Sequence, residues 1–313
     1  MLVLVAPGQG SQKPGLLTPW LEPPGAADRL SAWSDAIGLD LVHYGTEADA
    51  EEIRDTAVAQ PLLVAASLLS AYELLGEPGQ DGPPLGGVAA VAGHSVGELA
   101  AAALAGVLTP LEAMRIVHAR GQAMAEAAGA TETGMSAVLG GEQETVTAHL
   151  AELGLTPANM NGAGQIVAAG TREQLAALSE NRPEKARVVA LKVAGAFHTE
   201  HMSPAVPAME AAVSGVEPGD PVVPYISNLD GQAVDSGKEI VRRLVHQISA
   251  PVRWDLCMGT FEERGVTALV ELCPGGTLAG LAKRALPTVE RLALKSPEDL
   301  AAARDLVADH TSA

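Results

Sequence analysis

The sequence predicts an α/β fold, with a parallel sheet at the core of a large domain and a small βαββαβ domain inserted into it. Two apolar segments, residues 2–6 and 87–92, indicate buried parallel strands, and the second leads through a glycine-flanked serine into an alanine-rich helix. Between residues 135 and 193, short strand-like and helix-like segments alternate. The chain of 313 residues is long enough for both domains.

Composition and charge limit the classes of partner. The chain has 20 basic and 38 acidic residues, and 47% of its residues are hydrophobic. Because the net charge is strongly negative, we expect neither nucleic acid nor a membrane surface as a partner. The only cysteines, Cys257 and Cys273, suggest no disulfide framework or metal site, which favours a cytoplasmic location. The first residues lack the basic region of a signal peptide, and the apolar run 99–108 is too short to cross a bilayer.

The first part of the chain predicts a strand, a glycine loop and a long helix. The strand over residues 2–6 is followed by Gly8-Gln9-Gly10-Ser11-Gln12. This loop is not a dinucleotide-binding fingerprint, because Lys13 stands where the third glycine is needed. Further on, Gln60-Pro61 is expected to begin a helix that ends at Leu75.

Gly93-His94-Ser95-Val96-Gly97 has the pattern and the strand–helix setting of a nucleophile elbow. The turn is tight, so its glycines are required, and the amides at the start of the next helix point toward the serine oxygen. Ser95 is therefore the candidate nucleophile. The alternative is a strand-to-helix turn that carries a serine by chance. We expect the His94 side chain to point away from Ser95 and to be structural.

A serine nucleophile needs a base within hydrogen-bonding distance. His198 is favoured because it lies in a loop just after a predicted strand, where catalytic groups of α/β folds gather. His201 and His246 are its rivals. Asp230, Asp255 or a backbone carbonyl could orient the base, and the residues alone leave this choice open.

Arg120 is the next candidate functional residue. Thr109, Pro110 and Glu112 predict the start of its helix with a capping box. Three and four residues from Arg120 lie Ile116, Val117 and Met124, so the arginine should face inward. A buried arginine indicates either an internal salt bridge or a fork that binds a ligand carboxylate.

The middle of the chain predicts the small domain. Strands are expected over 135–139, 157–161, 165–169 and 187–193, and helices over 142–153 and 171–179. This order is the ferredoxin-like βαββαβ arrangement. We therefore predict a large domain formed by residues 1–126 and 196–313 and a small domain formed by 127–195. A late core strand is expected over 267–272.

Five motifs together resemble the malonyl-CoA:acyl carrier protein transacylase family, over about residues 3–290. They are the glycine loop, Gly93-His94-Ser95-Val96-Gly97-Glu98, His118-Ala119-Arg120-Gly121, Ala196-Phe197-His198-Thr199 and Gln247-Ile248-Ser249-Ala250-Pro251-Val252-Arg253-Trp254. The resemblance implies a hydrolase-like large domain with an inserted ferredoxin-like domain. It also implies transfer of malonyl from malonyl-CoA to the phosphopantetheine thiol of acyl carrier protein through an acyl-serine, in fatty acid or polyketide biosynthesis, with no bound cofactor or metal.

The resemblance also implies roles for individual residues. Ser95 is the nucleophile and His198 the base, held by the backbone carbonyl of Gln247, so no acid is required. The backbone amides of Gln9 and Val96 form the oxyanion hole. Arg120 pairs with the malonyl carboxylate.

Further implied contacts concern the acyl group. Either Asn159 or Asn161 touches the acyl-enzyme. Phe197 before the histidine and Val96 after the serine are typical of relatives that select malonyl over methylmalonyl. Two positions depart from the family pattern: Thr199-Glu200-His201 replaces Ser-Pro-Leu, and Cys273 replaces a glycine.

Three other functions use the same features: a serine esterase or thioesterase on this scaffold, an inactive module that binds carrier protein, and a polyketide loading acyltransferase. An inward arginine argues against the first, and intact Ser95 and His198 argue against the second. Since carrier proteins tend to be acidic, the carrier should dock on a local basic patch. Candidates for it are Lys185, Arg187, Lys192, Lys283 and Arg284.

Overall fold

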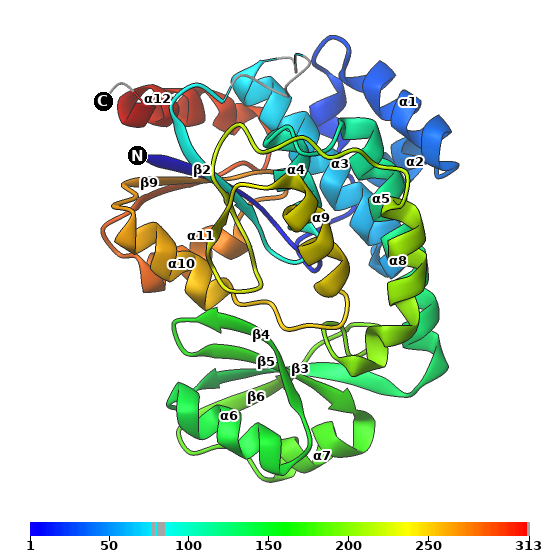
Figure 1. Cartoon of the computed structure of the whole chain (residues 1–313), viewed down its shortest axis with the longest axis vertical. Coiled ribbons are helices and arrows are strands. Elements are labelled where there is room, and N and C mark those ends of the chain that lie inside the picture. Colours follow the sequence, from blue (N-terminus) through cyan, green and yellow to red (C-terminus); the bar gives the residue numbers. More distant parts are fainter. Residues whose placement is uncertain (77–78, 80–84, 312–313) are drawn as a thin grey trace.

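The computed structural model describes residues 1–76, 79 and 85–311, and within them the chain forms two sheets (Figure 1). The larger sheet has the strand order β10-β9-β1-β2-β7-β8. Only β8 is antiparallel to its neighbour, and the other pairings are parallel. The predicted parallel-sheet core is therefore confirmed. Its strands are β1 (Leu2–Ala6), β2 (Val88–Gly93), β7 (Tyr225–Ile226), β8 (Ala233–Val234), β9 (Ala268–Glu271) and β10 (Glu290–Ala293).

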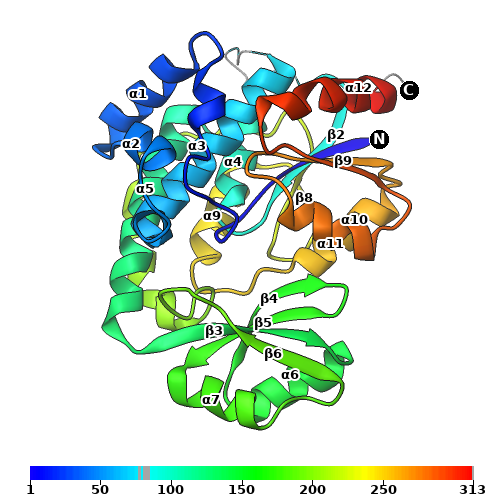
Figure 2. The same cartoon turned by 180° about the vertical axis from the view of Figure 1, so that it is seen from behind.

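Helices cover both faces of this sheet, because alternate side chains of β1 point to opposite sides. Leu2 and Leu4 join the apolar cluster of α3, α4, α5 and α12, whereas Val3 and Val5 join that of α10 and α11. Figure 2 shows the two groups of helices on either side of the strands. These helices are α3 (Thr56–Leu75), α4 (Gly97–Leu104), α5 (Pro110–Ala130), α10 (Trp254–Glu263), α11 (Thr277–Ala285) and α12 (Leu300–Thr311).

Shorter elements complete the large part of the molecule. The remaining α-helices there are α1 (Ala26–Ile37), α2 (Leu41–Thr46), α8 (Val206–Val213) and α9 (Gly237–His246). Short 3-10 helices cover Thr18–Leu21, Glu52–Arg54, Glu200–Ala205 and Pro297–Asp299.

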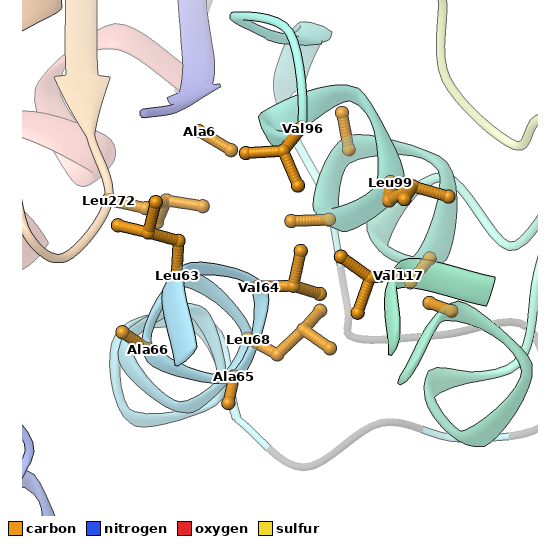
Figure 3. Packing of buried hydrophobic residues seen from close by; sticks show 14 of the residues in the cluster. Ala6, Leu63, Val64, Ala65, Ala66, Leu68, Val96, Leu99, Val117 and Leu272 are labelled. Carbon is orange, nitrogen blue, oxygen red and sulfur yellow. The ribbon is translucent and has the colours of Figure 1, made fainter. Parts of the chain in front are cut away.

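Helix α3 is the central helix of the main core. Its Val64 and Leu68 face α4 and α5, where Figure 3 shows Leu99 and Val117, whereas Leu63 lies beside Leu272. Among the described residues it is the one helix long and apolar enough to span a bilayer, but 89% of its apolar window is buried inside the protein, as in a core helix.

The predicted start of α3 at Gln60 was wrong by four residues. Asp55 caps the helix by accepting a hydrogen bond from the Ala57 N–H, so the helix begins at Thr56. Pro61 therefore lies inside the helix rather than at its first turn. This earlier start places Gln60 within the buried part of the helix, where its side chain is 1% exposed.

The second sheet is antiparallel and lies apart from the larger one, with α6 and α7 on its outer face (Figure 1). Its order is β4-β5-β3-β6. The elements follow the expected βαββαβ succession: β3 (Thr133–Gly140), α6 (Gln143–Glu152), β4 (Thr156–Gly162), β5 (Gln165–Thr171), α7 (Arg172–Glu180) and β6 (Ala186–Ala190). All six lie inside the predicted 127–195 segment.

The edge strand β4 is joined to the large part by a short parallel bridge. Met160 N–H donates to the Val252 carbonyl, and Val252 N–H donates to the Ala158 carbonyl, both at 2.9 Å. Because Val252 follows Gln247 closely in the chain, this bridge places the small sheet beside the residues described next.

Candidate active site

Ser95 lies in the turn between β2 and α4, with a φ of 54°. The turn allows no side chain at its glycines, because a Cβ on Gly93 would lie 2.0 Å from the Gly97 carbonyl carbon, and one on Gly97 would lie 2.3 Å from the Ala6 oxygen. Asn228 fastens the turn: its Oδ1 accepts from Ser95 N–H, and its Nδ2 donates to the Gly93 carbonyl, each at 2.8 Å. The serine is therefore held at the end of β2.

His198 is in hydrogen-bonding contact with Ser95, with 2.6 Å between Nε2 and Oγ. On the other side of the ring, Nδ1 lies 2.8 Å from the Gln247 carbonyl oxygen. A carbonyl only accepts, so Nδ1 carries the proton and Nε2 is free to accept from the serine hydroxyl. Burial and the nearby charge of Arg120 lower the pKa of His198 to about 3. The imidazole is therefore neutral at physiological pH.

The alternative partners of the base are engaged elsewhere. Asp230 pairs with Arg243 at 2.7 Å, and Asp255 pairs with Arg253 at 2.9 Å. His246, a rival of His198 as the base, is exposed at the end of α9. Of the candidates that could orient His198, the backbone carbonyl of Gln247 is the one in contact with it.

Arg120 is 1% exposed and faces inward. Its Nη1 donates to Gln60 Oε1 at 2.6 Å, while Nη2 donates to Gln247 Oε1 at 2.9 Å and to Ser95 Oγ at 3.4 Å. Burial lowers its pKa to about 10, against the opposing charge of Glu98, so the guanidinium stays charged at neutral pH. Within the described chain no carboxylate forms an ion pair with it. The internal salt bridge considered from the sequence is absent from these residues.

Glu98, Asn228 and Gln247 form a buried polar network behind the serine. Glu98 Oε1 accepts from Asn228 N–H at 2.6 Å, and Oε2 accepts from Gln247 Nε2 at 2.5 Å. Burial raises the pKa of the Glu98 carboxyl to about 8, although the Asn228 N–H and the charge of Arg120 lower it. The network thus links the turn at Ser95 to the segment that holds His198.

A cavity of about 90 Å³ opens beside the Ser95 hydroxyl. Phe197, 6% exposed, lines it. His94 also lines it, and its ring is held by structural contacts: Nε2 lies 2.8 Å from Asn161 Oδ1, and the ring packs edge-on against Trp254. The cavity is lined by Gln9, Gln60, His94, Ser95, Met124, Met135, Asn159, Val167, Leu191, Val193, Phe197 and His198.

The two asparagines of β4 have different surroundings. Asn161 is occupied, because its Oδ1 contacts His94 and its Nδ2 donates to Gln165 at 3.0 Å. Asn159 lines the cavity, and its buried Oδ1 has no hydrogen-bond partner among the described residues. The structure therefore leaves the Asn159 oxygen available to a ligand.

Two backbone N–H groups near the serine are also available. In the part of the chain that the structure describes, neither Gln9 N–H nor Val96 N–H donates a hydrogen bond to another group. Gln9 itself is fastened through its side chain, which donates to Thr56 Oγ1 at 3.2 Å. Across the described residues, no cluster of three or more His, Cys, Asp or Glu side chains is placed to hold a metal ion.

The sequence interpretation gave no role to Gln60, Glu98 or Asn228. A carboxylate in the alanine-rich run after the elbow was the available signal for Glu98, because a charge in an apolar buried helix needs a partner. Gln60 and Asn228 come from distant segments and carry no local signal.

Comparisons with known proteins identify the family of the chain. The acyl transferase domain family matches residues 3–300. The malonyl CoA-acyl carrier protein transacylase of Mycobacterium tuberculosis is 52% identical over 300 residues, covering 96% of this chain and 98% of the relative. The crystal structure of MCAT from Mycobacterium tuberculosis superposes with a TM-score of 0.92 at 51% identity, covering 97% of this chain and 99% of that one.

A further similar structure holds two proteins. It is a malonyl-transacylase in complex with its type II PKS acyl-carrier protein, with a TM-score of 0.87 and 30% identity, covering 97% of this chain and 99% of that one. The chain therefore belongs to the acyl transferase domain family and, within it, to the malonyl CoA-acyl carrier protein transacylases.

Proposed function

We propose that this chain transfers the malonyl group of malonyl-CoA to the phosphopantetheine thiol of acyl carrier protein through a malonyl-Ser95 intermediate. The observation that carries the substrate class is Arg120: a buried, charged guanidinium beside the nucleophile that contacts only neutral oxygens. A carboxylate at the end of the acyl group would supply the missing counter-charge.

Acylation begins with proton transfer from the Ser95 hydroxyl to His198 Nε2, across the 2.6 Å contact, as the oxygen attacks the thioester carbonyl. The Gln247 carbonyl keeps the ring in the tautomer that can accept this proton. The oxyanion is bound by the free N–H groups of Gln9 and Val96, each worth about 3–4 kcal/mol in sites of this type. Coenzyme A leaves as its thiol after His198 returns the proton.

Transfer reverses these roles with a different thiol. His198 accepts the proton of the phosphopantetheine thiol, the sulfur attacks the malonyl-serine ester, and Ser95 regains its proton when the ester bond breaks. The Asn159 amide, free in the cavity wall, contacts the acyl group in both steps. Phe197 closes the apolar side of the cavity.

The carrier protein and pathway follow from the same chemistry. Fatty acid synthesis is the favoured pathway, and polyketide synthesis is the second candidate, since a similar solved structure pairs a malonyl-transacylase with a type II PKS acyl-carrier protein. The basic candidates for carrier docking, Lys185, Arg187, Lys192, Lys283 and Arg284, are all exposed.

No bound cofactor is needed, because malonyl-CoA itself supplies the acyl group. Both cysteines are free and buried, which suits a cytoplasmic location.

Intact-mass measurement after mixing with malonyl-CoA tests the reaction and its nucleophile together. We expect one malonyl adduct, mapped to Ser95, that disappears when holo acyl carrier protein is added and is absent from Ser95→Ala. Continuous release of free malonate without carrier would identify an esterase or thioesterase instead. Absence of any adduct on the folded protein would favour an inactive carrier-binding module.

Arg120→Ala tests the substrate class. Loss of a charge-assisted pair between the guanidinium and the malonyl carboxylate should lower kcat/KM for malonyl-CoA by about two to three decades. Acetyl-CoA carries no such carboxylate, so its kcat/KM should be retained or increased. An equal fall for both substrates would refute the assignment of Arg120 to the malonyl carboxylate.

A further inference from the structure

Glu98 is a buried carboxylate to which the reaction steps above assign nothing. It is 1% exposed, lies in the first turn of α4 after the nucleophile, and contacts neither the cavity nor the Ser95 hydroxyl. Its two oxygens each accept from an N–H donor, one from Asn228 and one from Gln247. Burying a carboxylate is costly, so its presence in this position requires a compensating contribution from these contacts.

The Gln247 side chain can bind its neighbours in only one orientation. Arg120 is purely a donor, so the amide oxygen of Gln247 must face the guanidinium. The NH2 end then faces Glu98, where a carboxylate oxygen accepts at 2.5 Å. Above the Glu98 pKa of about 8 the carboxylate carries no hydrogen, so in that state it cannot accommodate the reversed amide, whose oxygen would then face a second acceptor.

This arrangement also explains how Arg120 keeps free hydrogen-bonding capacity. A direct ion pair would occupy the guanidinium, whereas Glu98 contacts Arg120 only through the Gln247 amide. We propose that Glu98 is a positioning residue for malonyl selection: through Gln247 it fixes the Arg120 guanidinium beside Ser95 and leaves the guanidinium available to the substrate carboxylate. This inference rests on the proposed function, in which Arg120 binds that carboxylate.

Glu98→Gln is the sharpest perturbation because it keeps the shape and changes one acceptor into a donor. With its oxygen toward Asn228 N–H, the new amide would present an NH2 group to the NH2 group of Gln247. Gln247 could then escape only by rotating its own NH2 group toward Arg120. Either arrangement loosens the guanidinium, whereas the Gln247 carbonyl that holds His198 belongs to the backbone and stays in place.

The experiment compares kcat/KM for malonyl-CoA and acetyl-CoA, at about pH 8.5 so that Glu98 is ionised in the wild type. In Glu98→Gln the malonyl-to-acetyl ratio should fall about tenfold, as for loss of one charge-assisted hydrogen bond. Glu271→Gln is the matched control, because Glu271 is equally buried but accepts from the backbone N–H groups of residues 276, 278 and 279. It should lower Tm and leave the ratio within about twofold of wild type.

Two further variants keep the outcomes separate. Glu98→Leu removes the acceptor without adding a donor, and its ratio decides the matter if Glu98→Gln does not fold. Parallel loss of both activities in Glu98→Gln or Glu98→Leu, with an unchanged ratio, would overturn the positioning role, provided that Arg120→Ala does lower the ratio. An unchanged ratio in Arg120→Ala would instead overturn the proposed function and, with it, this inference.

Discussion

Replacing Gly93 with alanine should disable the nucleophile while the chain still folds. The added Cβ would lie 2.0 Å from the Gly97 carbonyl carbon, whereas real Cβ contacts essentially never fall below 3.0 Å. The start of α4 must therefore move by about 1 Å, and Ser95, between the two glycines, moves with it. A misplacement of about 1 Å costs about 100-fold in rate in well-aligned sites. Overpacking of this kind also costs about 1–3 kcal/mol of stability.

The assay is single-turnover acylation of Ser95 by malonyl-CoA, followed by intact mass at a temperature well below the Tm of each variant. Gly129→Ala is the control, because a Cβ there meets nothing within 4 Å and the residue lies on the exposed side of α5. It should stabilise the chain by up to about 1 kcal/mol through helix propensity and leave the rate unchanged. A folded Gly93→Ala that acylates at the wild-type rate would refute the steric reasoning.

The remaining predictions concern protonation, the cavity and a helix cap. The pKa of His198 is about 3 in the folded chain and 6.5 in its ordinary state, so the unfolded chain binds the proton first and the free energy of unfolding falls as pH is lowered between these values. Urea titrations should show that this free energy falls more steeply with pH for wild type than for His198→Gln. Equal pH dependence in the two proteins would contradict the burial argument. For the same reason, the pH–rate profile of acylation should show no inflection near 6.5. Asn159→Leu should lower kcat/KM for malonyl-CoA about tenfold without lowering Tm, since its Oδ1 has no partner to lose; a lower Tm at full activity would count against a ligand contact. Thr109→Ala removes a complete capping box and should cost about 1 kcal/mol in thermal unfolding at unchanged activity.

The local parts of the site could be predicted from the sequence. The glycine pattern around Ser95, the capping box at Thr109 and the inward arc of Arg120 are properties of a few neighbouring residues, and each is present in the structure. The α/β class followed from apolar strands alternating with helices. The start of α3 was misplaced because a proline usually marks the first turn, whereas here the Asp55 cap sets the start at Thr56, four residues before Gln60.

The long-range parts could not be predicted from residues alone. His198 is 103 positions from Ser95, and Gln247 is a further 49 positions along the chain, so their contact depends on the packing of separate elements. Asp230 and Asp255 remained candidate partners of the base because the sequence does not show that they form ion pairs with Arg243 and Arg253. The different surroundings of Asn159 and Asn161 likewise depend on His94, which lies in the turn after β2 of the larger sheet.

The parallel bridge between β4 and Val252 ties the two halves of the molecule at one specific place. The strand that carries Asn159 and the segment that begins at Gln247 are joined by two backbone hydrogen bonds, so they cannot separate without breaking both. The bridge therefore keeps the part of the cavity wall that carries Asn159 at a fixed position relative to the segment whose Gln247 carbonyl supports the imidazole of His198.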